Sequence, residues 1–199
     1  MGKLNINTFF AMFLFVMITF AISCNRDDVI EPIEDEEDED ITYTLGETGP
    51  AGGIIFYVDE NGGGLEAAPA DWNGTGSDPS ARWGCVDVDV SGTSVEVGSG
   101  MANTQLILNA CHQDEIAAKR AADLVYNGFD DWYLPSKEEL LLLHQNRGLL
   151  DSYEDTWYWS SSQHFTSTAW AKHFAIGMPI EGRNKGTATN VRVRPVRSL

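Results

Sequence analysis

The hydrophobic positions of the chain fall into two periodic patterns, and the first predicts short strands. Apolar and β-branched residues run together over 53–58 and 65–70, with a glycine-rich turn at 61–64 between them. This arrangement predicts a β-hairpin. Alternation of Val with Asp over 85–90 predicts a half-buried strand. Three more strands are expected toward the C-terminus, at 157–161, 169–176 and 190–197.

The second pattern predicts helices in the middle of the chain, over 103–111 and 114–126, with Asn127-Gly128 ending the second. Another helix is expected after Ser136, because Ser136 and Glu139 form the Ser-x-x-Glu capping box. Loops fill 71–84 and most of the segment after 162. The folded part is therefore expected to be one strand-rich α+β domain with about two helices in its first half.

The N-terminus has the pattern of an export signal. Lys3 precedes an apolar run over 9–22, which is shorter than the roughly 20 residues that span a bilayer. The run ends in Ala21-Ile22-Ser23-Cys24, which resembles a bacterial lipobox. That resemblance predicts a signal peptide at 1–23 and a lipid anchor on Cys24, and hence an outer-membrane or cell-surface location. A plain signal peptide with an incidental cysteine is the alternative.

Charge is distributed unevenly along the chain. The formal net charge is −17, and ten acidic residues lie between Asp27 and Asp40. Like charges without apolar residues cannot collapse, so 24–45 is expected to be a disordered acidic linker before a domain at 46–199. The linker resembles the surface-export signals of Bacteroidetes lipoproteins, and a solvated spacer is the alternative. Residues 160–199 contain six basic residues and one acidic residue, a local charge of +5.

Three cysteines are present. With Cys24 lipidated, Cys85 and Cys111 remain in an exported, oxidising compartment, where a disulfide is the simplest interpretation. Two buried thiols or a metal pair are the other interpretations, although no His and Cys cluster has metal-ligand spacing.

Motifs for catalysis or cofactor binding are not found. The sequence contains no nucleophile elbow, zinc-protease helix, phosphate loop or dinucleotide fingerprint. The four histidines, at 112, 144, 164 and 173, do not have metal-ligand spacing, and His144 is expected on the exposed face of its helix. We therefore expect no cofactor and no resident metal. The acidic composition also argues against nucleic acid as a partner.

The C-terminal forty residues combine aromatic and basic side chains. Stacking aromatics with fixed donors suit sugars, and clustered Arg and Lys suit sulfate or carboxylate groups. For Trp170 and Phe174, however, alternating strand spacing favours core packing. Pairing with the acidic body is the alternative for Arg192, Arg194 and Arg197.

Several separate segments, taken in order, resemble one bacterial family, the C-terminal domain of the Legionella collagen-like adhesin. The resemblance covers nearly all of 46–199, and the segments that carry it are Gly49-Pro50-Ala51-Gly52-Gly53-Ile54-Ile55-Phe56-Tyr57-Val58, Gly64-Leu65-Glu66-Ala67-Ala68-Pro69, Trp83-Gly84-Cys85, Asn103-Thr104, Cys111, Ala121-Ala122, Asp131-Trp132-Tyr133-Leu134-Pro135-Ser136, Tyr158-Trp159-Ser160-Ser161-Ser162, Ala169-Trp170 and Val191-Arg192-Val193-Arg194-Pro195-Val196-Arg197.

This resemblance implies a C-type-lectin-like fold with about two helices and a twisted, mostly antiparallel sheet. It also implies a Cys85–Cys111 bridge and binding of a ligand, sulfated glycans being the ligand type known for the adhesin. The collagen-like stalk is missing from this chain, so trimerisation does not carry over. The sugar-binding triplets of calcium-dependent lectins are missing too.

Lectin-like domains of this class also serve as variable receptors in retroelement-diversified systems. The interval that varies in those receptors corresponds to 163–186 here. We therefore expect the ligand face to be formed by eight residues: Trp159, Gln163, His164, Lys172, His173, Met178, Glu181 and Arg183.

These observations predict a lipid-anchored, cell-surface binding or adhesion domain. Its partner is expected to be a glycan or a protein on another surface. An enzyme of the formylglycine-generating type, which shares the lectin-like fold and needs a reactive cysteine pair, is one alternative. A structural envelope lipoprotein is another.

Overall fold

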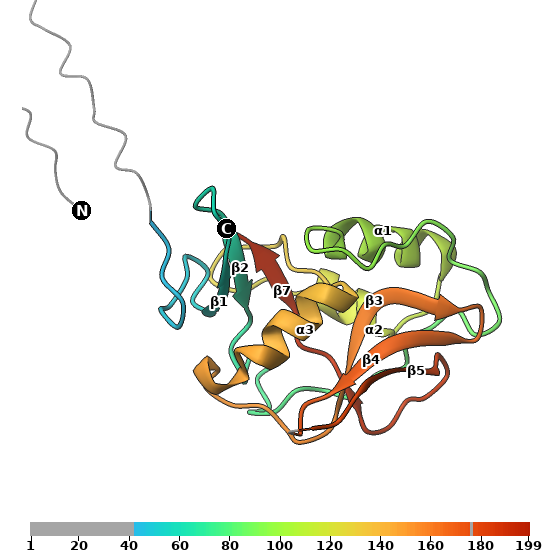
Figure 1. Cartoon of the computed structure of the whole chain (residues 1–199). Coiled ribbons are helices and arrows are strands. Elements are labelled where there is room, and N and C mark those ends of the chain that lie inside the picture. Colours follow the sequence, from blue (N-terminus) through green and yellow to red (C-terminus); the bar gives the residue numbers. More distant parts are fainter. Residues whose placement is uncertain (1–41, 176) are drawn as a thin grey trace, which may run out of the picture. The chain divides into compact units, whose positions relative to one another are not determined.

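The computed structural model describes residues 42–175 and 177–199 (Figure 1). The predicted signal peptide, the predicted lipidation site at Cys24 and the predicted linker as far as residue 41 lie outside the described residues. Strands β1 (Ile54–Val58) and β2 (Gly64–Ala67) form the predicted hairpin. Strand β7 (Val196–Ser198) pairs antiparallel with the other edge of β2. This three-stranded sheet joins the beginning of the folded part to its end.

A second sheet has the order β5-β4-β3-β6. It consists of β3 (Trp157–Phe165), β4 (Thr168–His173), β5 (Ile180–Asn184) and β6 (Val191–Arg192). Strand β4 pairs antiparallel with both β3 and β5, whereas β6 runs parallel to β3. The single strand predicted at 190–197 is therefore two short strands in different sheets. Pro195, which lacks an N–H donor, lies in the crossing between them.

The sequence pattern does not predict strand β5, because it lies between the predicted strands at 169–176 and 190–197, where a polar loop is expected. Only Ile180 in Ile180–Asn184 is a strong strand former. The strand forms through backbone pairing with β4, in which Gly182 lies opposite Trp170. An edge strand held in this way needs no hydrophobic alternation, so the sequence pattern could not reveal it.

Three α-helices are present among the described residues: α1 (Gly100–Ala110), α2 (Ala117–Ala122) and α3 (Lys137–Gln145). A short 3-10 turn, η1 (Arg147–Leu149), follows α3. The predicted capping box is confirmed, since Ser136 accepts from the Glu139 backbone and Glu139 accepts from the Ser136 backbone. The fold is thus α+β, as predicted.

Helix α2 covers only the centre of the predicted 114–126 helix. Glu115 has a left-handed φ of 62°, which prevents the helix from starting earlier. Asn127 and Gly128 both have positive φ and form the tight turn between Tyr126 and Phe129, which form an isolated antiparallel bridge. The Asn-Gly pair therefore marks a small hairpin rather than the end of a helix.

The strand predicted at 85–90 is wrong. Cys85 and Asp87 have left-handed φ values of 49° and 59°, which a strand does not allow. The Val88 N–H donates to the Cys85 carbonyl at 3.1 Å, so the chain turns here. Val86 and Val88 are both exposed, which shows that the alternation does not mark a buried face.

Helix α3 contacts both sheets, through β1 on one side and through β3 and β4 on the other. Its Leu140 and Leu143 are fully buried with Phe56 and Tyr158. A second core cluster lies around Trp83 and includes α1, α2 and Trp159. Residues Asp40–Leu199 form one compact unit.

A buried ion pair connects three parts of this unit. The Arg194 guanidinium donates to both oxygens of Asp78 at 2.8–3.0 Å, and both side chains are 2% exposed or less. Tyr158 of β3 and Trp72 of the preceding loop also donate to the Asp78 carboxylate, at 2.8 and 2.9 Å. Four donors therefore satisfy a charge that burial would otherwise penalise strongly.

Breaking this ion pair should destabilise the protein. Arg194→Met leaves Asp78 buried without its main partner, which typically costs about 3–5 kcal/mol. We expect the melting temperature to fall by about 10 °C. Arg183→Ala removes a half-exposed Arg paired with Glu181 and serves as the control, with a change of only a few degrees. Equal losses in the two variants, measured by differential scanning calorimetry, would contradict this role.

His144 lies half-buried against Phe174, with ring centroids 5.4 Å apart, rather than on an exposed face. Burial lowers the pKa of His144 to about 4, and the charges of Lys172 and Arg147 act in the same direction. The pKa in the unfolded chain is about 6.5. The unfolded state therefore binds the proton more readily, and stability is lost as the pH falls from about 6.5 toward 4.

His144→Leu should weaken this acid sensitivity. The drop in melting temperature between about pH 7 and pH 5 should be smaller in the variant than in the parent protein, because the buried group no longer titrates. His112→Leu, at an exposed position, is the control and should retain the full drop. An unchanged drop in His144→Leu would show that His144 does not contribute.

Candidate ligand-binding surface

Strand pairing divides the predicted ligand residues between the two sides of the second sheet. Trp157 lies opposite His173, and Ala171 lies opposite Glu181. Directly paired residues point to the same side, and neighbours along a strand alternate. His173, Glu181 and Arg183 therefore share one side, whereas Lys172 points to the other. The eight predicted residues do not form one continuous face.

The residues on the first side form a small cluster around Trp157. The His173 ring meets the Trp157 indole edge-on at 5.1 Å, and the Arg183 guanidinium lies 4.4 Å from the indole centroid. Glu181 is paired with Arg183 at 3.1 Å. These side chains are partly exposed, but their polar groups already contact one another.

Trp159 and Lys172 are corrections to the predicted ligand face. Trp159 is fully buried, and its indole N–H donates to the Ala81 carbonyl at 2.8 Å. Lys172 is 6% exposed, and its ammonium donates to the Met178 carbonyl. Burial holds the pKa of Lys172 below its usual value. Met178 itself remains exposed.

The basic residues of the C-terminal segment mostly face inward. Besides Arg194, Arg197 binds Asp131 through two hydrogen bonds of 2.8 and 2.9 Å and reaches Glu66 at 3.1 Å. Lys185 is fully buried. The hydrogen bond to Arg197 lowers the pKa of Asp131. Most of the basic side chains behind the local charge of +5 are therefore buried in internal contacts, so they do not make a basic surface.

A buried run of serines fixes the strand behind the surface. Ser160, Ser161 and Ser162 are all 0% exposed. The Ser160 carbonyl accepts from the Trp83 indole at 2.8 Å, and the Ser161 N–H donates to the Pro135 carbonyl at 2.7 Å. These contacts hold the central strand in one position.

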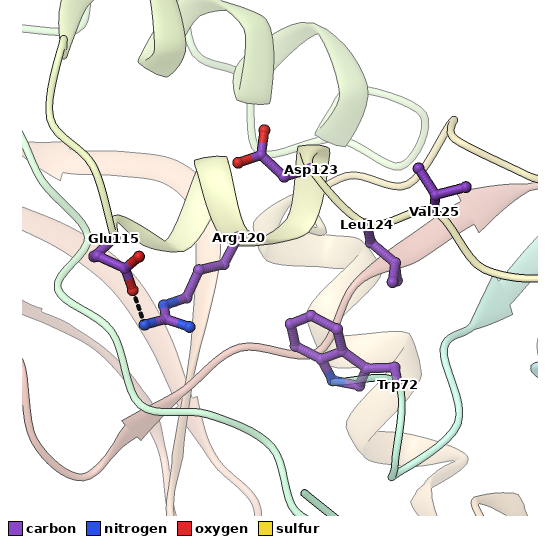
Figure 2. Close-up of a pocket in the computed structure, with 6 residues that line it drawn as sticks. All are labelled: Trp72, Glu115, Arg120, Asp123, Leu124 and Val125. Atoms are coloured by element: carbon purple, nitrogen blue, oxygen red, sulfur yellow. Dashed lines mark hydrogen bonds and ion pairs between the residues drawn. The ribbon is translucent and has the colours of Figure 1, made fainter. Parts of the chain in front are cut away.

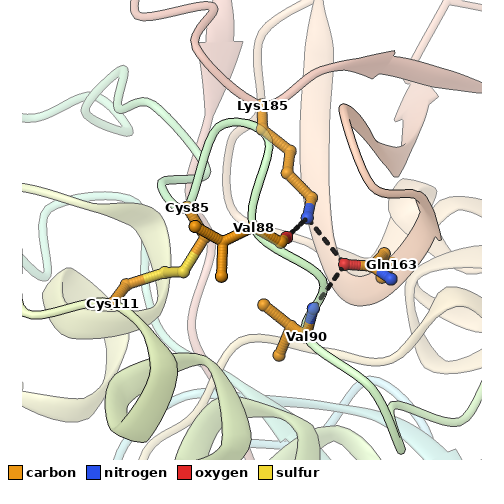
Figure 3. Close-up of a disulfide and its surroundings, with 6 residues drawn as sticks. All are labelled: Cys85, Val88, Val90, Cys111, Gln163 and Lys185. Carbon is orange, nitrogen blue, oxygen red and sulfur yellow. Dashed lines mark hydrogen bonds between the residues drawn. A yellow bond between two sulfur atoms is a disulfide. The ribbon is translucent and has the colours of Figure 1, made fainter.

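Gln163 forms a latch between this strand and an adjacent loop, which we call the latched loop (residues 85–98). Its side-chain oxygen accepts from the Val90 N–H at 2.8 Å and from the Lys185 ammonium at 2.6 Å (Figure 3). Its amide nitrogen donates to Asp89 at 2.6 Å. Lys185 also donates to the Val88 carbonyl at 2.9 Å. Burial lowers the pKa of Lys185 to about 8, so the ammonium form still predominates at neutral pH.

The Cys85–Cys111 disulfide is present and anchors the same loop to the end of α1 (Figure 3). The two cysteines are 26 residues apart, and a bridge over such a loop typically stabilises a protein by about 3 kcal/mol. Covalent and hydrogen-bonded ties thus hold a loop that has almost no regular secondary structure.

An aromatic cluster lies at the β3–β4 turn, and we call it the aromatic tip (His164, Phe165, Trp170 and Lys137). The His164 ring lies 4.0 Å from the centroids of both Phe165 and Trp170, and the Lys137 ammonium lies 5.1 Å from the Trp170 centroid. Phe165 is 65% exposed, whereas Trp170 is half-buried. A Cβ on Gly182 would lie 2.0 Å from His164, so any larger residue at position 182 would displace this ring.

The sequence analysis missed Phe165 and favoured a core position for Trp170. The available signal was position: Phe165 directly precedes the two-residue polar turn Thr166-Ser167, where a hairpin exposes its end residues. An exposed aromatic that packs against a neighbouring ring is an ordinary anchor for a ligand.

No family model matches the chain, and no match is found among the curated proteins compared with it. In residues 42–175 and 177–199, no helix is long and apolar enough to cross a membrane. The same residues contain no group of three or more His, Cys, Asp or Glu side chains arranged to hold a metal ion.

The latch predicts a measurable change in local opening. Gln163→Ala removes the acceptor of the Val90 N–H, so this amide should exchange with solvent about ten times faster, a cost of about 1.4 kcal/mol. Gln105→Ala, at an exposed position of α1, is the matched control and should leave Val90 unchanged. Unaltered exchange in Gln163→Ala, measured by hydrogen-exchange NMR, would show that the latch does not hold the loop.

Proposed function

We propose that the chain is a lipid-anchored, cell-surface binding domain of the C-type-lectin-like class. Its ligand lies on another surface and contacts the aromatic tip together with the latched loop. The observation that carries this proposal is the exposed Phe165, which packs at a tilt on His164 as His164 does on Trp170, beside a loop with a disulfide anchor.

Two features support the lectin-like assignment. The first is the resemblance of many ordered segments across 46–199 to the adhesin family. The second is the arrangement itself, in which a long irregular segment is tied to a helix by a disulfide and lies against a mostly antiparallel sheet. In such a domain the irregular segment and the neighbouring strand ends are free to vary without altering the core.

The exposed side chains favour a protein surface as the ligand. Val86, Val88 and Phe165 are 42%, 44% and 65% exposed, and apolar groups of this kind mark interaction surfaces when they are supported by a rigid body. A sulfated glycan would instead need exposed cations, and the basic residues of 160–199 are mostly buried in internal pairs. A neutral glycan remains the second ligand class.

Diversification of 163–186 is compatible with this arrangement. Substitutions at the exposed Phe165, Met178 and Glu181 would leave the core packing intact. By contrast, Lys172 and Lys185 are buried and hydrogen-bonded, so they cannot vary freely. A reverse transcriptase gene with a template repeat beside the coding sequence would support a diversified receptor, and the lack of both would remove that version of the proposal.

The enzyme alternative needs a reactive pair of cysteines, and Cys85 and Cys111 are instead bonded to one another.

A lipid on Cys24 would place the domain at the membrane, with the acidic linker as a spacer. Protease treatment of intact cells tests the outward orientation: release of the domain supports it, and protection contradicts it.

The binding proposal is tested with an array of purified extracellular proteins and an array of neutral and sulfated glycans. We expect saturable capture by at least one protein and a loss of at least about tenfold in Phe165→Ser, because the variant removes the exposed anchor. Leu45→Ser, at another exposed apolar position, is the matched control and should bind normally. A folded parent protein that binds neither array, or an unchanged affinity in Phe165→Ser, would overturn the proposal.

A further inference from the structure

A pocket of about 470 Å³ lies beside α2 and shares no residue with the aromatic tip (Figure 2). Small-molecule sites commonly have volumes of about 300–1,000 Å³. The residues that line it come from the loop before Asp78 and from both ends of α2: Trp72, Glu115, Arg120, Asp123, Leu124 and Val125. No function considered above uses them.

The apolar wall of the pocket is held in place. Trp72 is half-buried, and its indole N–H donates to the buried Asp78 at 2.9 Å, which fixes the ring. Leu124 is 8% exposed beside it, and Val125 is 68% exposed at the rim. A flat indole with aliphatic neighbours offers an apolar contact surface that needs no rearrangement before a ligand binds.

The polar wall provides acceptors and a donor. The Glu115 side chain is 71% exposed, and its carboxylate can accept hydrogen bonds. Asp123 is 60% exposed but is paired with Lys119 at 2.9 Å, and Figure 2 shows its carboxylate on the side of α2 away from Trp72. Arg120 is paired with Glu115, and Figure 2 shows its guanidinium on the side of α2 that faces Trp72. The Nε of Arg120 is buried and has no hydrogen-bond partner among the described residues. The wall thus offers a carboxylate and a guanidinium that are paired with each other.

We propose that this pocket binds a pyranose sugar that is neutral or carries an amine. The ligand must present an apolar face to Trp72 and Leu124 while it both donates and accepts hydrogen bonds at its edge. A pyranose ring meets these conditions, because its axial hydrogens form the apolar face and its hydroxyls donate and accept. An amine on the ring can pair with the exposed Glu115 carboxylate.

The same charges disfavour an acidic sugar. Both cations of this part of α2 are already paired, Arg120 with Glu115 and Lys119 with Asp123, so a uronic acid would meet no unpaired cation. The proposal does not rest on the function of the aromatic tip, and the two can fail separately.

The test is saturation-transfer difference NMR on the full-length chain in detergent micelles. The probes are D-glucosamine, N-acetyl-D-glucosamine, D-galactose and D-glucuronate, with tyramine as an aromatic amine that is not a sugar. We expect at least one neutral or amino sugar to saturate with a dissociation constant of about 1 mM, typical of a single small ring. D-Glucuronate should bind at least about tenfold more weakly.

Arg120→Ala should weaken the best sugar by at least about fivefold, because it removes the donor at the wall. Arg183→Ala is the matched control, since Arg183 is also a partly exposed Arg paired with a nearby glutamate. Val125→Glu, at the exposed rim, is a second pocket variant that does not touch the core. Phe165→Ser should leave sugar binding unchanged, which separates this site from the aromatic tip.

Three results would overturn the proposal. The first is the lack of saturable binding of any neutral or amino sugar up to about 50 mM, more than tenfold above the expected constant. The second is tighter binding of D-glucuronate or tyramine than of these sugars. The third is a normal affinity in both folded pocket variants.

Discussion

The Asp78 carboxylate is the constraint on which much of the domain depends. A buried charge is tolerated only when its hydrogen-bonding capacity is filled, and here four donors fill it from three distant parts of the chain. Trp72 belongs to the irregular loop, Tyr158 to the central strand, and Arg194 to the segment that crosses between the sheets. One carboxylate therefore fixes the wall of the α2 pocket, the strand behind the aromatic tip and the crossing of the C-terminal chain.

Pairing of buried charges also explains the uneven charge distribution along the chain. The acidic body and the basic C-terminal segment, separate in sequence, are paired in the fold: Asp78 with Arg194, and Asp131 with Arg197. These cations neutralise internal carboxylates and bury most of their own surface. The side chains that remain exposed at the β3–β4 turn and in the latched loop include the apolar Phe165, Val86 and Val88 but no unpaired basic cluster of 160–199. This difference moves the expected ligand away from sulfated glycans and toward protein surfaces.

The sequence predicted the elements that local chemistry determines. The glycine turn gave the first hairpin, the capping box gave the start of α3, and the cysteine count pointed to the bridge that is present. The secondary-structure predictions failed where tertiary contacts override the local sequence pattern. Left-handed φ values at Cys85 and Glu115 abolish a predicted strand and shorten a predicted helix, and the alternation of residues could not show either.

The sequence indicates where along the chain the candidate site lies, but not which side chains are exposed there. The interval 163–186 contains the exposed turn, but Trp159 and Lys172 are not available to a ligand, because each is buried and hydrogen-bonded to a backbone carbonyl. Which side chains of a strand face outward depends on register, and β3 has bulges between Trp159 and Gln163 and again before Phe165. A single sequence does not reveal a bulge, and each bulge changes the side on which the following residues lie.

Chromatography of the full-length chain on immobilised heparin tests the central claim most directly. If the cations of 160–199 serve internal contacts, the protein should pass through the column at about 0.15 M NaCl, because residues 42–175 and 177–199 then present no exposed basic cluster to the heparin. Retention that requires about 0.5 M NaCl or more for elution would show a basic ligand surface. That result would contradict the assignment of these residues to the interior and restore a sulfated glycan as the ligand.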